Sequence, residues 1–489
     1  MRRATQRPDK GTSKRIAWPV AAILVAVAVA GCAAGPQTQS DQAPPDPPAP
    51  PDLLGQCDTD RPAVAHGPGA EVRQPEFLLY PCLSKTGAIS REPTMGVDSD
   101  GTVYHYPAMT GDNTQPMGVA ISRDRGDTWE HVLPDIAGVP LHRTSVDPYF
   151  YHDRWTDRIF ADDLLTPNCS YFSWSDDGGA SWDHSISGCM ETDHQTIFSA
   201  PPVTSDPDGY ANAVYRCAIN AVALGAYGTI STCQKSLDGG LTWLPPGEPA
   251  FITRTDQLPE YCSGAHGHGW GDNEGTIYLP KNHCGVPMLA ISDDEGASWR
   301  QAAVADIGVI GHDGGVAVDG NGTIYYTWIA GDGLPHVAYS LDAGATWSDP
   351  MMYGPPGLKH ARFAEVYVND AGMFASAYMG TWQEAGDPER VYDAVLSVSY
   401  DLLGKATFYS QAINGPNDAF IVGGCCQGLQ DFLDVVIGPD GTAWGAYVDD
   451  CLGPGMACST REITPGVEEA LDTQREGAVG WFTRGSAHR

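Results

Sequence analysis

The sequence predicts an all-β fold, namely a β-propeller of seven four-stranded antiparallel blades, with a six-bladed ring as the alternative. Three observations predict it. An octapeptide recurs five times, a second Asp- and Gly-rich turn recurs alongside it, and the octapeptide aspartates are 48 to 61 residues apart. A repeat of that length suits one four-stranded sheet rather than one coil of a short solenoid.

The octapeptide reads Ser-x-Asp-x-Gly-x-(Ser or Thr)-Trp. In a tight hairpin of this composition the Asp side chain accepts turn amides, Gly adopts a positive φ, and the hydroxyl residue re-enters a strand. We therefore expect structural turns with inward-packing tryptophans and no catalytic role. The copies begin at Ser122, Ser175, Ser236, Ser292 and Ser340, and a degenerate sixth runs from Ser399 to Phe408.

A second turn precedes each octapeptide and leads into β-branched or aromatic residues, as expected for a hairpin between two strands. Its glycines are Gly101, Gly209, Gly275, Gly322, Gly372 and Gly441. A further unit without glycine fits around Thr156–Phe160, which makes seven units. The last unit lacks an octapeptide. We expect residues 479–482 and the N-terminal residues 77–80 to supply its outer strands, so that the two chain ends close the ring and remove exposed sheet edges.

The N-terminus predicts export. Residues 1–31 combine a basic N-terminal segment, an apolar stretch and small residues directly before Cys32, as in a lipoprotein signal peptide. Cleavage before Cys32 would leave a thiol for a lipid anchor on the membrane surface. An ordinary signal peptide or a retained anchor helix is the alternative. Residues 32–55 read as a lipidated cysteine and a Pro-rich linker, and residues 56–489 as the propeller domain.

The charge balance argues against nucleic acid as a partner. The full chain carries a net charge of −33, and removal of the signal peptide would leave 22 Lys and Arg against 60 Asp and Glu, a net charge of −38. Such acidity favours solubility or cation binding at the surface over recognition of an anionic polymer. We expect a monomer that touches the membrane only through its lipid.

The chain has 13 cysteines, and lipidation of Cys32 would leave an even twelve. Close spacings suggest four local disulfides, appropriate to an oxidising compartment. For Cys425 and Cys426 two options compete: separate bridges to Cys451 and Cys458, or a vicinal disulfide. The four local pairs are Cys57 with Cys82, Cys169 with Cys189, Cys217 with Cys233, and Cys262 with Cys284.

The inner strands of a propeller converge on a central channel, so residues at their beginnings are candidates for a binding site. Ten positions before four of the turn glycines lie ionisable residues, and further basic and imidazole groups occupy similar places. The alternative is that these side chains only hydrogen-bond loops around a solvent-filled hole. The candidates are Arg91, Arg143, His194, His266, His268, His312, His360, Arg362 and Asp431.

The residue types at this channel mouth suggest two kinds of ligand. Arginines suit a carboxylate or phosphate through two-point hydrogen bonds. Clustered histidines could hold zinc or copper if three converge, and calcium could bind the Asp-rich turns, although hairpin geometry explains those turns without an ion. The sequence therefore predicts no particular cofactor, and a bound divalent metal, namely zinc, copper or calcium, is the alternative.

The octapeptide resembles the Asp-box of the sialidase-like propeller superfamily. The resemblance implies a propeller and extends over residues 76–449 as a fold. It implies that Arg91 grips a ligand carboxylate, because Ser90–Pro93 resembles the opening Arg-Ile-Pro segment of that family. It also makes Asp112 a candidate acid/base group. The segment that carries the family's tyrosine nucleophile falls here on Phe432, and the glutamate position falls on or near His266.

Because the nucleophile is absent, three functional hypotheses remain. The first is a surface lipoprotein that binds a glycan or another anionic ligand at the channel mouth without turnover. The second is a divergent sialidase-like glycoside hydrolase that uses Asp112, His266 or Asp431 in place of the usual groups. The third is a metalloenzyme with a histidine site.

Overall fold

The fold is described from a computed structural model of the chain. The chain divides into two compact units, Met1–Pro51 and Asp52–Arg489, and all of the described residues belong to the second. The structure describes residues 56–107, 118–134, 148–165, 169–187, 193–219, 230–252, 265–311, 313–384, 387, 390–421, 432–450 and 476–485.

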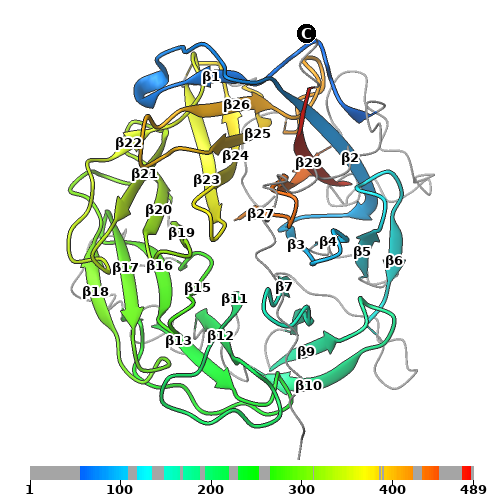
Figure 1. Cartoon of the computed structure of the whole chain (residues 1–489), viewed down its shortest axis with the longest axis vertical. Coiled ribbons are helices and arrows are strands. Elements are labelled where there is room, and N and C mark those ends of the chain that lie inside the picture. Colours follow the sequence, from blue (N-terminus) through cyan, green and yellow to red (C-terminus); the bar gives the residue numbers. More distant parts are fainter. Residues whose placement is uncertain are drawn as a thin grey trace, which may run out of the picture. The chain divides into compact units, whose positions relative to one another are not determined.

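Seven antiparallel sheets form a ring, which confirms the seven-bladed propeller (Figure 1). The innermost strands contact one another in the order β3, β7, β11, β15, β19, β23, β27 and back to β3, so the ring is closed. Five blades are built from four consecutive strands. Their bounds are β3 Thr94–Val97, β4 Val103–Tyr106, β5 Val119–Ser122 and β6 Glu130–Val132 in blade 1; β7 Tyr149–His152, β8 Ile159–Leu165, β9 Cys169–Ser175 and β10 Asp183–Ser187 in blade 2; β11 Asp193–Ala200, β12 Ala213–Ile219, β13 Ile230–Ser236 and β14 Phe251–Ile252 in blade 3; β15 Trp270–Gly271, β16 Ile277–His283, β17 Val286–Ser292 and β18 Arg300–Ala303 in blade 4; and β19 Gly315–Val318, β20 Ile324–Ile329, β21 Pro335–Ser340 and β22 Met351–Met352 in blade 5.

The last two blades take strands from the beginning of the described chain. Blade 6 contains β23 to β26 and gains a fifth strand, β1, which the sequence did not predict. In blade 7 the third strand is C-terminal β29 and the outermost is N-terminal β2. The bounds are β1 Val64–His66, β23 His360–Val368, β24 Phe374–Thr381, β25 Asp393–Ser399 and β26 Phe408–Ala412 in blade 6, and β2 Leu79–Ile89, β27 Asp434–Ile437, β28 Ala443–Asp449 and β29 Glu476–Arg484 in blade 7.

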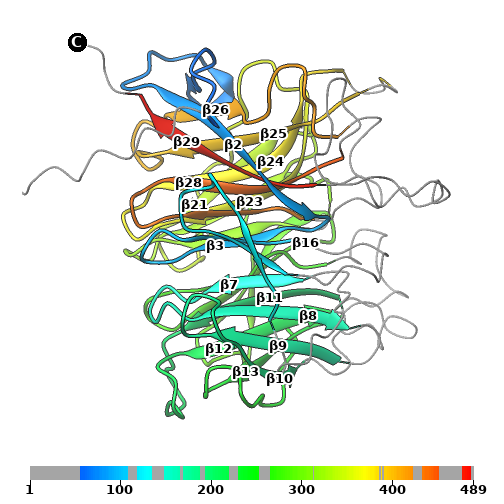
Figure 2. The ribbon, with the colours of Figure 1, turned by 90° about the vertical axis from the view of Figure 1, so that its right-hand side faces the viewer.

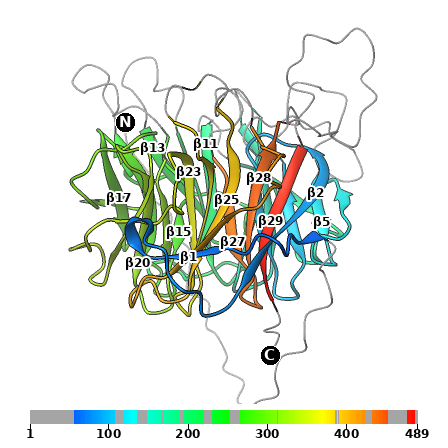
Figure 3. The ribbon, with the colours of Figure 1, turned by 90° about the horizontal axis from the view of Figure 1, so that it is seen from above.

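The pairing of β2 with β29 closes the ring, as predicted. Leu79 lies opposite Arg484 and Cys82 opposite Trp481 in an antiparallel register. The two strands run side by side in both side views (Figures 2 and 3). The strands extend beyond the predicted residues 77–80 and 479–482, because the ladder continues to Ile89 opposite Glu476. Ring closure therefore joins segments about 400 positions apart in the chain.

The octapeptides form the predicted hairpins between the third and fourth strands. In the first copy Asp124 accepts hydrogen bonds from the Thr128 backbone N–H at 2.9 Å and from the Ser122 hydroxyl at 2.8 Å. Gly126 has a φ of 87° and donates its N–H to Ser122 Oγ. Asp177, Asp238, Asp294 and Asp342 repeat this pattern.

Seven apolar clusters fill the spaces between neighbouring blades, one cluster for each of the seven interfaces that the described residues form. Successive strand residues point to opposite faces of a sheet, so each blade feeds the two interfaces beside it. Tyr104, for example, packs on Phe150 between blades 1 and 2. This arrangement explains why strands such as β3, β4 and β12 are buried on both faces rather than on one.

Two of the predicted disulfides are present, Cys57–Cys82 and Cys217–Cys233. Cys169 and Cys284 are also disulfide-bonded, but their predicted partners Cys189 and Cys262 lie outside the described residues. Cys32 and the group Cys425, Cys426, Cys451 and Cys458 lie outside them as well. Within the described part of the chain, no helix is long and apolar enough to cross a membrane.

Candidate functional site

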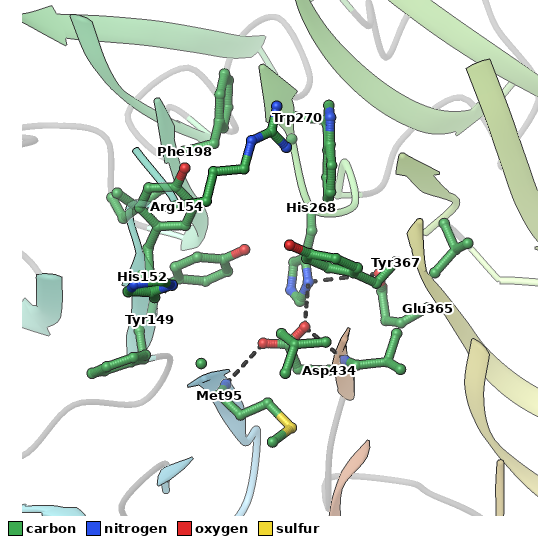
Figure 4. Close-up of a pocket in the computed structure, with 18 of the residues that line it drawn as sticks. Met95, Tyr149, His152, Arg154, Phe198, His268, Trp270, Glu365, Tyr367 and Asp434 are labelled. Atoms are coloured by element: carbon green, nitrogen blue, oxygen red, sulfur yellow. Dashed lines mark hydrogen bonds and ion pairs between the residues drawn. The ribbon is translucent and has the colours of Figure 1, made fainter. Parts of the chain in front are cut away.

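The inner strands enclose a cavity along the channel of the propeller (Figure 4). Its empty volume is about 730 Å³, part of it open to solvent, which is in the range of small-molecule sites. All seven blades contribute lining residues, and most of these lie in the later halves of the inner strands. Those with functional side chains are Tyr149, Tyr151, His152, Arg154, His268, Trp270, Glu365, Tyr367 and Asp434.

One repeat position supplies the polar centre of this cavity. His268, Glu365 and Asp434 each lie seven positions before a turn glycine, at Gly275, Gly372 and Gly441 respectively. The blades are copies of one unit, so residues at equivalent positions lie at the same depth along the channel. Blade 2 lacks the glycine, but Tyr149 lies four residues before Asp153, which begins its turn. The four side chains therefore form one layer.

His268 reaches across the channel to the carboxyl groups of blades 6 and 7. Its Nδ1 lies 3.6 Å from Oε2 of Glu365 and 3.9 Å from Oδ1 of Asp434. The ring of Tyr149 meets the imidazole edge to face at 5.0 Å. Asp434 is fixed by the backbone N–H groups of Met95 and Val435, each at 2.8 Å. Two carboxyl groups thus converge on a single point (Figure 4).

Burial controls the ionisation of these groups. Only 5% of the Glu365 side chain and 14% of the Asp434 side chain are exposed. Burial raises the pKa of Asp434 to about 7. Burial, followed by the charges of Asp434 and Asp313, raises the pKa of Glu365 well above its usual range. Burial lowers the pKa of His268 to about 3. The pair therefore holds at least one proton at neutral pH beside a neutral imidazole.

Aromatic rings and one arginine form the next layer. Trp270 and Tyr367 follow His268 and Glu365 by two residues, so they point the same way one step further along the strands. Their rings meet edge to face at 5.0 Å. The Arg154 guanidinium lies 5.2 Å from the Trp270 ring and donates to the Gly271 carbonyl at 3.2 Å. The cavity therefore combines an aromatic wall with buried hydrogen-bond acceptors.

Three predicted histidines lie close together. His268 lines the cavity, whereas His194 and His266 are not among its lining residues. Phe432 connects them, because its ring lies 5.3 Å from the ring of His194 and 5.1 Å from that of His268. His194 Nδ1 lies 3.0 Å from the His266 carbonyl oxygen, and burial lowers the pKa of His266 to about 3.

The other described candidates lie away from this cavity. His360 begins β23 and lies 3.1 Å from the hydroxyl of Tyr392 through its Nδ1. Burial and the charge of Arg362 lower the pKa of His360 to about 4. Arg91 is partly buried in the segment before β3. The candidates Asp112, Arg143, His312 and Asp431 lie outside the described residues.

A metal centre is not formed by the described residues, in which no group of three or more His, Cys, Asp or Glu side chains is arranged to hold an ion. His268, Glu365 and Asp434 are the nearest approach to one.

Sequence reasoning missed Glu365, Asp434, Tyr149, Trp270 and Tyr367 as site residues. It counted ten positions back from the turn glycines, which reaches the beginnings of the inner strands. Counting seven positions back identifies His268, Glu365 and Asp434. The repeat therefore contained the position of these three residues. The sequence did not show which repeat position faces the cavity, because the depth at which the channel widens depends on side-chain packing.

Comparison with known proteins does not assign a family. No family model matches the sequence, and no curated protein matches it. Among solved structures, the Aleuria aurantia lectin aligns at 9% identity over 68% of this chain and 99% of its own, with a TM-score of 0.42. An α-L-arabinofuranosidase from Fusarium graminearum aligns at 11% identity over 70% and 98%, also with a TM-score of 0.42.

The NanB sialidase from Streptococcus pneumoniae aligns at 11% identity over 77% of this chain and 68% of its own, with a TM-score of 0.38. At these identities and scores, similarity carries no information about the ligand or the reaction. Membership of the sialidase-like superfamily stays a prediction from the octapeptide.

Proposed function

We propose that the protein is an exported lipoprotein whose propeller binds a carbohydrate in the channel cavity. A saccharide presents apolar C–H faces and rows of hydroxyl groups. The cavity offers a complementary surface, because Trp270 and Tyr367 form an aromatic wall one step from the acceptors of Glu365 and Asp434. This stacking of an aromatic layer on a polar layer is the observation that carries the proposal.

The cavity favours a neutral or cationic ligand over the anionic one that the arginines of the sequence suggested. Its centre contains two carboxyl groups, while Arg362 and Arg91 do not line it. The one lining arginine, Arg154, already stacks on Trp155 at 4.1 Å and bonds Asn273 Oδ1 at 3.0 Å. A ligand anion inside the cavity would meet like charge whenever Asp434 ionises.

Calorimetric titration of the purified full-length protein with a panel of mono- and disaccharides tests the proposal. We expect at least one saccharide to bind, and Trp270→Ala to weaken its affinity by at least about tenfold. Trp382→Phe is the control, because Trp382 does not line the cavity and donates its indole N–H to the Pro356 carbonyl. Equal affinities for Trp270→Ala and the unaltered protein would reject carbohydrate binding in the channel.

A second function, glycoside hydrolysis, is favoured by one observation. Glu365 and Asp434 form a buried carboxyl pair that holds a proton near neutral pH, and such pairs supply the acid and base of most glycosidases. Release of a fluorescent aglycone from a panel of glycosides, abolished by Glu365→Gln, would support it. Binding without turnover would leave the non-catalytic role.

The lipid anchor is a separate part of the proposal. It rests on the sequence that ends at Cys32. We expect the unaltered protein to partition into detergent and Cys32→Ser to stay in the aqueous phase. A cleaved protein without acyl mass on its N-terminal peptide would contradict this, and the ordinary signal peptide would replace it.

A further inference from the structure

The polar layer of the cavity contains three side chains, His268, Glu365 and Asp434, that face one another and do not hydrogen-bond to one another. The distances from His268 Nδ1 to Glu365 and Asp434, 3.6 and 3.9 Å, are too long for hydrogen bonds. Among the described residues, no donor within hydrogen-bond distance of the Glu365 carboxyl is found, although the residue is only 4% exposed. A buried carboxyl without donors is costly, which points to a donor that comes with a ligand.

The charges around the cavity indicate that this donor is a cation. No lysine or arginine forms an ion pair with Glu365 or Asp434 among the described residues, and the neutral His268 supplies no compensating charge. The cavity around them is aromatic, with Tyr149, Tyr367 and Trp270 in its lining. Aromatic faces attract cations, as the stacking of Arg154 on Trp270 already demonstrates in this cavity.

The number of acceptors matches an ammonium group. In the tautomer that carries its proton on Nε2, an atom that is buried and has no hydrogen-bond partner among the described residues, His268 presents the Nδ1 lone pair toward the two carboxyl groups. Asp434 accepts one backbone N–H on each oxygen and retains further lone pairs. An –NH₃⁺ group has three donors, one each for Glu365, Asp434 and His268.

We propose that the channel site of Glu365, Asp434 and His268 binds a primary ammonium group, so that the carbohydrate ligand is an amino sugar. The amino-sugar part of this inference rests on the proposed function, whereas the ammonium site does not. The ammonium takes the place of the proton that the carboxyl pair holds, and that proton passes to solvent. The sugar ring then lies against Trp270 and Tyr367.

Titration of the purified full-length protein with D-glucosamine, N-acetyl-D-glucosamine, D-glucose and methylammonium tests this. N-acetylation keeps the ring but removes the charge and two of the three donors. We expect D-glucosamine to bind at least about tenfold more tightly than either neutral sugar. Repeating the titration in buffers of different ionisation enthalpy should reveal the release of up to about one proton.

Each outcome separates the two proposals. Equal affinity for glucosamine and glucose overturns the ammonium site and leaves carbohydrate binding in place. Binding of methylammonium without any sugar supports the ammonium site and removes the carbohydrate. Failure of all four ligands to bind overturns the ammonium site, and the panel of mono- and disaccharides then decides carbohydrate binding by itself. Net proton uptake on binding, at a pH at which the amine of free glucosamine is fully protonated, would also overturn the ammonium site. The other titratable groups around the pair are His268, Tyr149, Tyr326, Tyr353, Tyr367 and Asp313.

Two isosteric variants identify the residues. Glu365→Gln and Asp434→Asn should each weaken glucosamine binding by at least about tenfold while changing glucose affinity by less than about threefold. Thermal unfolding shows whether each variant is folded, and the proton-release measurement on the unaltered protein covers the case in which neither folds. Glu384→Gln is the control, because Glu384 pairs with Lys359 at an exposed site. Equal losses for both sugars in a folded Glu365→Gln protein would contradict the inference.

Discussion

Glu365 and Asp434 lie on the inner strands of adjacent blades, and each has a carboxyl oxygen within 4 Å of the same imidazole nitrogen, Nδ1 of His268. Neither strand could place these groups alone, because β23 and β27 belong to different sheets. The pair is therefore a product of the packing of blade 6 against blade 7. Its electrostatics give the first prediction.

Asp434→Asn should change the pH dependence of stability. Burial raises the folded-state pKa of Asp434 to about 7 from 3.8, so its contribution is fully present below about pH 4 and is lost as pH rises through 7. Relative to the unaltered protein, the free energy of unfolding of the variant should therefore rise by up to about 4 kcal/mol between about pH 4 and about pH 8. Urea unfolding across that range measures the difference.

Asp440→Asn provides a control of opposite sign. Asp440 lies on the same blade, and bonds from the Thr442 N–H and Arg125 hold its pKa below the usual range. That variant should lose stability relative to the unaltered protein as pH rises from acid. Parallel pH profiles for Asp434→Asn and the unaltered protein would show that Asp434 is not desolvated in solution.

Arg216→Leu should destabilise the propeller severely. Arg216 and Asp162 are both fully buried and lie 2.8 Å apart, and Arg216 also donates to Ser170 Oγ. Loss of the guanidinium leaves a buried carboxylate, which costs about 3 to 5 kcal/mol. Chemical unfolding measures it. Lys359→Ala breaks the exposed pair with Glu384 and should cost less than about 1 kcal/mol. A comparable loss in both variants would contradict this ranking.

Asp238→Ala should lower stability without affecting the channel. Asp238 accepts from the Thr242 N–H, the Thr242 hydroxyl and the Ser236 hydroxyl in the third octapeptide turn. Their loss should cost about 1 to 3 kcal/mol. Saccharide affinity of the folded variant should stay unchanged, because the turn joins the outer two strands of its blade. A variant of normal stability with lost binding would give the turn a functional role instead.

Removal of the Cys57–Cys82 disulfide by a double Ser substitution should cost about 3 kcal/mol, because the bridge closes a loop of 25 residues in the unfolded chain. The Cys217–Cys233 bridge closes a loop of 16 and should contribute slightly less. Thermal unfolding of the two double variants compares them. If removal of Cys217–Cys233 costs far more stability than removal of Cys57–Cys82, native-state contacts rather than unfolded-chain entropy determine the contribution of these disulfides.

The repeat made the fold predictable, and it also explains what was missed. The octapeptides and turn glycines mark strand ends through local chemistry, so seven blades follow from the sequence even where Asp157 replaces the usual glycine at a positive φ of 60°. β1 was missed because three residues, Val64–His66, carry too little periodicity to announce a strand. Its place depends on blade 6 offering an open edge.

The site was only partly predictable for a different reason. His268 was predicted because it lies shortly before the turn glycine Gly275, where an inner strand begins. Glu365 and Asp434 occupy the equivalent position two and three blades later, but their importance depends on pointing across a channel whose width no local pattern encodes. Trp270 and Tyr367 were missed because aromatic residues on strands ordinarily fill interfaces between blades.

The pairing of β2 with β29 has a consequence for how the protein matures. The sheet that closes the ring contains both β2 and β29, so blade 7 cannot form before both strands have been synthesised. Until β29 has inserted between them, β2 and β28 each expose an unpaired edge to which a strand of another chain could add. If the N-terminus carries the proposed lipid anchor, the anchored end lies close in sequence to β2, and β2 remains unpaired until β29 has been made.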